Sequence, residues 1–288
     1  MKFLDHCTLC FSKDIHELDA SYRHAWLVKC RQCGFVFSGR IPEYDELIAH
    51  YAKYQRGEAI SPITVKRYEE LLQTFSNKIK GRTILDVGCG NGDFLDVAAS
   101  KKWNVYGTEF DPIAVDLCKQ KKINIFSGTL KDFDLTDQLD VITSFEVMEH
   151  INNPDEEIQR IHQLLKPGGL FYFTTPNFNS FSRRFLKGKW NVIEYPEHLS
   201  YFSPSVIDNT LRGAGFEKIY LKTTGISIQR FRTSLKNTPH GSTTSNADQS
   251  FRANAEKNIL LKGVKNLANF ILSSTNSGDT IKGLYRKR

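Results

Sequence analysis

Four cysteines near the amino terminus form two close pairs, Cys7-x-x-Cys10 and Cys30-x-x-Cys33. Two cysteines separated by two residues in a tight turn direct both sulfurs at one ion, and four thiolates complete the tetrahedral shell of Zn²⁺. Because no position remains for water, the spacing predicts a structural zinc site, whose ion would stabilise a unit too small for a large core. Unrelated thiols that happen to lie close in sequence are the alternative interpretation.

A glycine-rich loop in the sequence ILDVGCGNGDF, residues 84–94, joins a short apolar run to a helical pattern. Gly88, Gly90 and Gly92 allow a tight turn and let a ligand approach the backbone without a Cβ in the way. The third glycine of a dinucleotide fingerprint is absent. The next apolar run ends at Glu109, about twenty residues further on, where a carboxylate can accept hydrogen bonds from both hydroxyls of a ribose. The loop therefore predicts an adenosine ligand.

The segment 194–202, EYPEHLSYF, is dense in aromatic and titratable side chains. Its His198 is the first candidate for a general base, because the unperturbed pKa of histidine is near neutral. His150, which follows the apolar run 139–145, is the second candidate. For either residue, a histidine that only packs against its neighbours or caps a loop is the alternative.

Short apolar runs that alternate with helical patterns must position these groups. The runs TILDV, NVYGTEF, INIFSG, LDVITSF and GGLFYFTTP are spaced by helical segments between residues 83 and 176. Nearly all-apolar strands that alternate with helices indicate a parallel sheet covered on both faces, so the predicted fold class is α/β. We also expect a helix over 64–80 that Gly81 ends, a helix capped by Asn153, another capped by Ser203, and a final strand over 279–285.

The chain has 288 residues, and none of its apolar runs approaches the roughly 20 residues of a membrane-spanning helix. Together with thiols suited to a reducing compartment, this predicts a cytoplasmic protein. The net charge of +7 is concentrated in the last quarter, where thirteen Lys and Arg from residue 218 onwards face three acids. We expect a helix over 251–274, with Lys257, Lys262 and Lys265 beside an apolar stripe, to form a lid over a binding cleft. A membrane surface is the alternative partner of this helix.

Between residues 80 and 222 the sequence resembles the class I S-adenosylmethionine-dependent methyltransferases. The resemblance rests on LDVGCGNG, on the strand that ends at Glu109, on LDVITSFEVMEHI and on LLKPGGLFYFTTPN. It implies a Rossmann-like, doubly wound, mostly parallel sheet of seven strands. S-adenosylmethionine (SAM) would lie across the carboxyl ends of the first strands.

The residues that the resemblance assigns to SAM follow four consecutive strands. They are Asp86, Gly88, Gly90 and Gly92 at the methionine half, Glu109 at the ribose, Thr129 and Leu130 at the adenine, and Phe145, Glu146 and His150 on the far side. Many relatives carry an acid at the adenine turn, and Asp132 is the alternative contact here. Related enzymes place the acceptor in the segment that contains His198.

The cysteine unit, a tyrosine-rich connector and this core together resemble bacterial methyltransferases of glycan and secondary-metabolite biosynthesis. The expected activity is therefore a methyltransferase of class EC 2.1.1 that O-methylates a sugar or a small-molecule or lipid-linked glycan precursor. An RNA methyltransferase is the first alternative, but the basic residues lie far in sequence from the cysteine unit, so nucleic acid is not the expected partner. A non-catalytic SAM-binding scaffold is the second alternative.

The expected domain organisation follows from these patterns. It comprises a zinc-ribbon-like unit over 1–38, a helical connector over 39–80, a SAM-binding core over 81–222, a helical insertion over 223–275 and a final strand of the core over 276–288. No pattern in the sequence indicates an oligomeric state.

Overall fold

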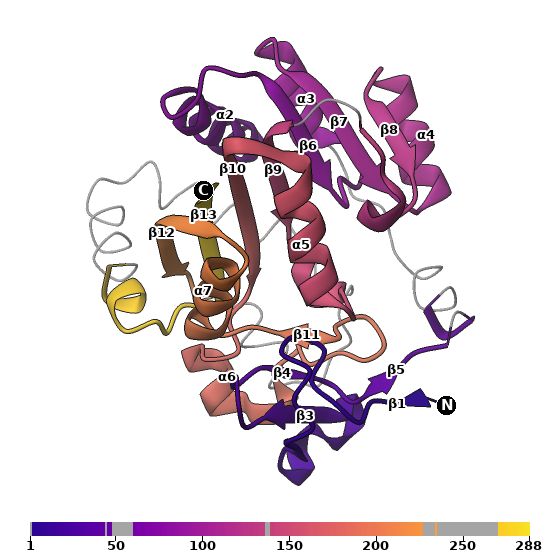
Figure 1. Cartoon of the computed structure of the whole chain (residues 1–288), viewed down its shortest axis with the longest axis vertical. Coiled ribbons are helices and arrows are strands. Elements are labelled where there is room, and N and C mark those ends of the chain that lie inside the picture. Colours follow the sequence, from indigo (N-terminus) through magenta and orange to yellow (C-terminus); the bar gives the residue numbers. More distant parts are fainter. Residues whose placement is uncertain (1, 44, 48–59, 136–138, 227–233, 235–269) are drawn as a thin grey trace.

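The computed structural model describes residues 2–43, 45–47, 60–135, 139–226, 234 and 270–288 of the chain. Seven strands form its central sheet: β6 (Thr83–Val87), β7 (Asn104–Glu109), β8 (Asn124–Ser127), β9 (Leu139–Phe145), β10 (Leu165–Pro176), β12 (Phe216–Thr224) and β13 (Thr280–Lys287). Their order across the sheet is β12-β13-β10-β9-β6-β7-β8 (Figure 1).

The central sheet is mostly parallel. Strands β6 to β10 pair in parallel, whereas β13 lies antiparallel between β10 and β12. The α/β fold with a seven-stranded, mostly parallel sheet is therefore confirmed. The strand order reverses beside β6, which pairs with β7 on one side and β9 on the other. A ligand crevice is expected at the carboxyl ends of the strands at such a point.

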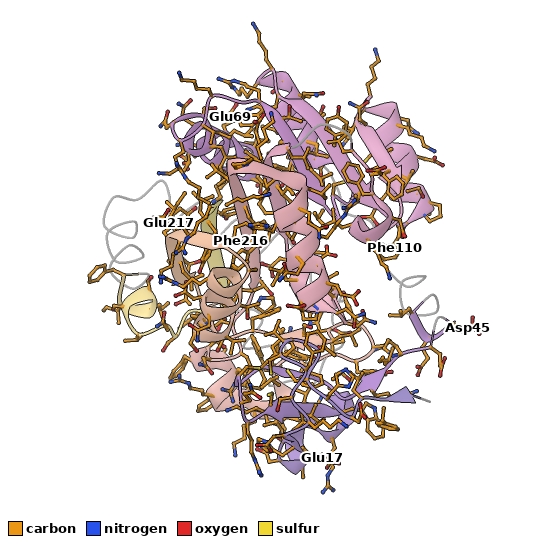
Figure 2. All side chains as sticks on the ribbon, in the orientation of Figure 1. Glu17, Asp45, Glu69, Phe110, Phe216 and Glu217 are labelled. Atoms are coloured by element: carbon orange, nitrogen blue, oxygen red, sulfur yellow. The ribbon has the colours of Figure 1, made fainter. Side chains whose placement is uncertain are left out.

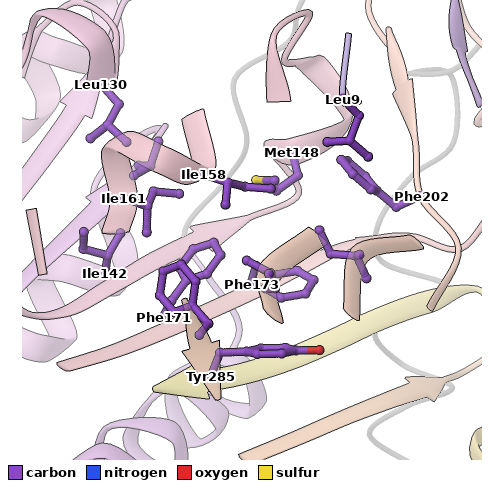
Figure 3. Packing of buried hydrophobic residues seen from close by; sticks show 14 of the residues in the cluster. Leu9, Leu130, Ile142, Met148, Ile158, Ile161, Phe171, Phe173, Phe202 and Tyr285 are labelled. Atoms are coloured by element: carbon purple, nitrogen blue, oxygen red, sulfur yellow. The ribbon is translucent and has the colours of Figure 1, made fainter. Parts of the chain in front are cut away.

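Helices cover both faces of the sheet. They are α2 (Pro62–Ser76), α3 (Asp93–Ser100) and α4 (Pro112–Gln120) on one face, and α5 (Pro154–Leu164) and α7 (Pro204–Gly213) on the other. On the second face, Ile158 and Ile161 of α5 belong to the same buried cluster as Phe171 and Phe173 of β10 (Figure 3). Burial of such large apolar side chains stabilises the fold by about 1.5–3 kcal/mol each.

The helix ends agree only in part with the sequence signals. Ser203 caps α7 as expected, because its side chain accepts a hydrogen bond from the backbone N–H of Val206. Asn153 precedes α5, but its side chain makes no capping hydrogen bond. The helix expected over 64–80 ends at Ser76. Gly81 does not end it: a Cβ there would lie 2.1 Å from the carboxyl group of Asp140, so the glycine permits a close approach.

The cysteine-containing segment forms a separate small sheet that borrows a strand from far along the chain. Its strands are β2 (Ile15–Glu17), β3 (Leu27–Cys30), β4 (Val36–Ser38) and β11 (Ser200–Tyr201), in the order β11-β4-β3-β2. Phe35 stacks on Phe37 and contacts Phe202, so this sheet continues the core of the α/β domain. Figure 1 shows the small sheet below α5, at the end where α5 begins.

Within the predicted carboxyl-terminal insertion over 223–275, the structure describes residues 223–226, 234 and 270–275. The lysines of the predicted helix over 251–274 lie outside the described residues, whereas residues 270–274 are helical. The hydroxyl group of Thr223 donates a hydrogen bond to the carbonyl of Leu272 at 2.7 Å, which ties this last turn to β12. Within the described ranges, no helix is both long and apolar enough to span a membrane.

Candidate active site

The glycine loop after β6 leaves space for a ligand at one of its three glycines. Gly88, Gly90 and Gly92 have φ of 61°, 54° and 73°, a region that disfavours a side chain. A Cβ on Gly88 would lie 2.8 Å from Val147, and one on Gly92 would lie 2.5 Å from Ile123. For Gly90, no atom of the described residues beyond its chain neighbours lies within 4 Å of that position. The outer glycines therefore permit close packing, and Gly90 faces open space.

Glu109, at the carboxyl end of β7, is held against this loop. One carboxylate oxygen accepts a hydrogen bond from the backbone N–H of Gly90 at 3.0 Å. The other accepts from the N–H groups of Phe110 and Asp111, at 2.9 and 3.0 Å. These bonds fix the carboxylate beside Gly90. The next residue, Phe110, is 53% exposed, and its side chain projects outward from the ribbon (Figure 2).

Asp86 lies near the carboxyl end of β6, just before the glycine loop, and its side chain is buried. Burial raises the pKa of its carboxyl group to about 8, although a hydrogen bond from the Thr143 hydroxyl at 2.6 Å opposes this shift. Near neutral pH the group is therefore largely protonated in the ligand-free protein. A cation bound at this point would favour the ionised carboxylate and lower its pKa.

Aromatic side chains from α2, α3 and β9 pack against one another at the carboxyl end of β9. The ring of Phe145, which ends β9, lies 4.9 Å from Phe94 and 5.8 Å from Tyr68, measured between centroids. Burial raises the pKa of Tyr68 to about 12, and the nearby carboxylate of Asp86 adds to the shift. Tyr68 is thus close to Asp86, and the sequence alone did not single it out. Its only signal was the tyrosine-rich connector.

The turn after β8 presents one of its two expected residues to the interior. Thr129 is linked to Asp132 by a 3.0 Å hydrogen bond between its hydroxyl and the carboxylate. Leu130 is 1% exposed and belongs to the core (Figure 3). Its side chain packs against the protein, so a contact with adenine would fall to the backbone of this turn. The roles of both residues stay predictions.

The two candidate bases are neighbours in the structure. The rings of His150 and His198 meet edge to face, with 4.8 Å between their centroids. His150 Nδ1 lies 3.0 Å from the carbonyl oxygen of Glu197, and His198 Nδ1 lies 2.7 Å from that of Val192. Burial lowers the pKa of His150, while the Glu197 and Glu146 carboxylates oppose the shift without reversing it. His150 is therefore neutral near pH 7.

Glu149 completes this group and was not singled out from the sequence. It is 2% exposed, and its carboxylate accepts a hydrogen bond from the Thr175 hydroxyl at 3.0 Å. Its backbone carbonyl accepts a hydrogen bond from the N–H of Leu199 at 2.7 Å, which ties the loop of His198 to the end of β9. The signal that could have found Glu149 is its position next to His150 in the sequence, because both residues lie on the same turn.

The four paired cysteines converge on one point. Their sulfur atoms lie within 4.8 Å of one another. Across the two pairs, Cys7 and Cys33 are 3.6 Å apart and Cys10 and Cys30 are 3.5 Å apart, measured between Sγ atoms. A tetrahedral ion with Zn–S bonds of 2.3 Å would place its sulfurs about 3.8 Å apart. The donor set and its spacing therefore fit Zn²⁺, with no ligand position left for water.

Comparison with known proteins points to one family. A family model described as a methyltransferase domain matches residues 51–221, more than half of the chain. A protein of Mycolicibacterium smegmatis named as a probable S-adenosylmethionine-dependent methyltransferase is 29% identical over 155 residues, which cover 53% of this chain and 58% of that protein. The chain thus spans little more than half the length of this relative.

Two further comparisons concern a named activity and the fold. A ubiquinone biosynthesis O-methyltransferase of Azoarcus sp. is 27% identical over 160 residues, or 50% of this chain and 67% of that protein. The crystal structure of a SAM-dependent methyltransferase from Archaeoglobus fulgidus superposes with a TM-score of 0.51 at 19% identity. The superposition covers 85% of this chain and all of the other. At that identity, the likeness supports the fold alone.

Proposed function

Because the chain belongs to the methyltransferase-domain family, we propose that it transfers the methyl group of SAM to a hydroxyl group of a small molecule. One observation carries the donor side of this proposal. At the strand-order reversal, the open space at Gly90 lies beside a carboxylate, Glu109, that is fixed by three backbone hydrogen bonds. An adenosine ligand requires this pairing of an approachable backbone with a ribose-binding acid.

The residues around Gly90 suit the different parts of SAM. Glu109 would accept hydrogen bonds from the ribose hydroxyls, and the loop backbone with Asp86 would hold the cationic methionine half. The turn at Thr129 and Leu130 would border the adenine, and Phe145 would lie on the far side. SAM supplies an activated methyl group on a sulfonium, so the protein must mainly align the acceptor and remove its proton.

The acceptor side lies at His150 and His198. These histidines come from two segments that meet only in the folded chain, at 4.8 Å between ring centroids, next to the end of β9. A relative named as an O-methyltransferase supports a hydroxyl acceptor. A sugar or glycan precursor is our first choice, since the lysines predicted for the carboxyl-terminal insertion would attract a phosphorylated substrate. The buried Ser234 within this insertion contacts the chain just before the acceptor loop (residues 194–202, which include His198), because its hydroxyl accepts a hydrogen bond from Asn191 N–H at 3.0 Å.

A structural zinc ion at Cys7, Cys10, Cys30 and Cys33 forms part of the proposal. The cluster fits the ion in donor type and spacing, as described above. It lies on the small sheet that includes β11, so the ion would stabilise the neighbouring acceptor loop. Cytoplasmic location is likewise part of the proposal, because thiolate sites of this kind persist where cysteines are kept reduced.

Transfer of a labelled methyl group from SAM tests the proposed function. The purified protein would be incubated with sugar nucleotides, lipid-linked glycans, small phenols and total RNA, with heat-denatured protein as the control. We expect label in a small hydroxylated acceptor. Label found in RNA alone would replace this proposal with an RNA methyltransferase. Tight SAM binding without transfer to any acceptor class would favour a binding scaffold.

SAM binding should release a proton and strengthen as the pH rises. The raised pKa of Asp86, about 8, means that the cationic ligand binds best once this carboxyl group ionises. Affinity should increase by about tenfold or more between pH 6.5 and 8.5 and then level off. The stability that protonated Asp86 contributes is fully present below the ordinary carboxyl pKa of 3.8, and it is lost progressively as the pH rises from there to about 8.

Calorimetry in two buffers of different ionisation enthalpy measures this proton release directly. The Asp86→Asn variant has no titratable group at this position, so any SAM binding that it retains should be independent of pH over the same range. Wild-type affinity that does not change between pH 6.5 and 8.5 would show that Asp86 does not sense the donor.

A further inference from the structure

Three side chains that commonly bind metal ions gather next to the carboxyl edge of the sheet. Glu149 and His150 lie on the single turn η3 (Met148–His150) after β9, and His198 lies on the loop before β11. One ligand-type atom from each residue lies within 4.8 Å of those of the others. Two imidazoles and a carboxylate form a donor set that suits divalent ions such as Mn²⁺, Fe²⁺ and Zn²⁺.

The hydrogen bonds of both imidazole rings prepare them for this role. Each Nδ1 faces a backbone carbonyl oxygen, from Glu197 for His150 and from Val192 for His198. A carbonyl only accepts, so in the neutral ring Nδ1 carries the proton and Nε2 carries the lone pair. Metal-binding histidines typically donate their other N–H to a carbonyl or carboxylate in this way.

The carboxylate shows the same support from its surroundings. The Thr175 hydroxyl donates a hydrogen bond to Glu149 at 3.0 Å, and Glu149 and Thr175 are both buried. A cation beside a buried carboxylate offsets the free-energy cost of removing that charge from water. With metal–ligand bonds of about 2.1 Å, neighbouring ligand atoms around one ion lie about 3.0–3.4 Å apart, so side-chain shifts of about 1 Å would close the group on an ion.

We infer that Glu149, His150 and His198 bind one divalent cation, which also takes the acceptor hydroxyl as a ligand. Coordination of the acceptor hydroxyl rests on the proposed function, whereas cation binding does not. Coordination lowers the pKa of a hydroxyl, so its proton passes to water. The oxygen lone pair then forms the bond to the methyl carbon while the carbon–sulfur bond breaks and its electron pair stays on sulfur. The histidines thus act as ligands and need not carry the proton themselves.

Titration of the full chain with Mn²⁺, followed by the electron paramagnetic resonance signal of the free ion, tests this site. Zinc stays bound at the cysteines, which prefer it to Mn²⁺ because thiolate is a soft ligand. We expect one Mn²⁺ per chain. His198→Asn keeps an N–H donor for the Val192 carbonyl but removes Nε2, and should weaken Mn²⁺ binding by about tenfold or more. His150→Asn is an independent second variant with the same expected result.

His162→Asn is the matched control, because His162 packs edge to face on Phe216, away from this group. It should bind Mn²⁺ like the wild type. No Mn²⁺ bound by the wild type, or equal binding by all variants that still bind SAM, would overturn the inference. Methyl transfer without Mn²⁺ binding would leave the proposed function standing and remove the cation. Mn²⁺ binding without transfer to any acceptor would leave the cation site standing and remove the proposed function.

Discussion

Gly90→Arg is expected to abolish SAM binding in a protein that remains folded. The backbone at Gly90 has a φ of 54°, and a Cβ there would point into open space next to Glu109. The Cβ of the new side chain would therefore meet no described atom beyond its chain neighbours, and the rest of the arginine would fill the space that the ligand needs. We expect the dissociation constant for SAM to rise by about 10²-fold or more, measured by calorimetry.

The control for this variant is a second glycine with the same backbone strain. Gly168 has a φ of 77°, and no atom of the described residues beyond its chain neighbours lies within 4 Å of a Cβ placed there. It lies near the start of β10, at the opposite end of the strands from the cofactor loop. Gly168→Arg should lower the melting temperature about as much as Gly90→Arg, because a left-handed residue costs about 1–2 kcal/mol in each. It should bind SAM normally. Equal loss of SAM binding in both variants would show that strain, not occupied space, is responsible.

The sequence predicted the parts of this molecule that depend on local patterns. Nearly all-apolar runs separated by helical periods predicted the parallel strands, because only a sheet covered on both faces buries such runs completely. Glycine spacing predicted the tight loop and the position of Glu109 at the next strand end. Close cysteine pairs predicted a four-thiol cluster. Each of these predictions depends on residues that lie close to one another in the sequence.

The features that the sequence did not reveal depend on contacts between distant segments. The pairing of β11 with β4 joins residues more than 160 positions apart, and a two-residue strand has no periodicity to detect. The meeting of His150 with His198 depends on another long-range contact, the hydrogen bond from the N–H of Leu199 to the carbonyl of Glu149. The side chain of Leu130 lies in the core, so the predicted contact of its turn with the adenine stays a prediction for the backbone. Gly81 was predicted to end a helix, but a glycine is needed there because the Asp140 carboxyl group leaves no room for a Cβ.

The same long-range contacts connect the cysteine cluster to the acceptor loop. The N–H of Ser38, at the end of β4, donates to the carbonyl of Leu199 at 2.8 Å, and the N–H of Leu199 donates to the carbonyl of Glu149 at 2.7 Å. The hydroxyl of Ser200 donates to the carbonyl of Ile151 at 2.5 Å. The small sheet is therefore one wall of the loop that carries His198. No described hydrogen bond of this chain of contacts involves the glycine loop.

Removal of one cysteine ligand should therefore impair methyl transfer without affecting the donor. Cys10→Ser is expected to lose the zinc ion, which elemental analysis should find at one per chain in the wild type, because serine is a poor Zn²⁺ ligand. Turnover should fall by about tenfold or more as the loop of His198 loosens, since a small misplacement at the reacting groups has a large effect. The SAM dissociation constant should stay within about twofold of the wild type, which is under about 0.5 kcal/mol.

Cys10→His separates loss of the ion from loss of the cysteine. A site with three cysteines and one histidine still binds Zn²⁺ tetrahedrally, and Cys10 is only partly buried, so it has room for the ring. This variant should retain zinc and most of the turnover. Hydrogen exchange should show faster opening of residues 191–202 in Cys10→Ser than in Cys10→His, with equal protection of β6 and β9. If zinc is absent from the wild type, or if Cys10→Ser turns over at the full rate, the cysteine cluster does not support the acceptor loop. A parallel loss of SAM binding would instead mean that the small sheet stabilises the whole α/β domain through the shared core at Phe35 and Phe202.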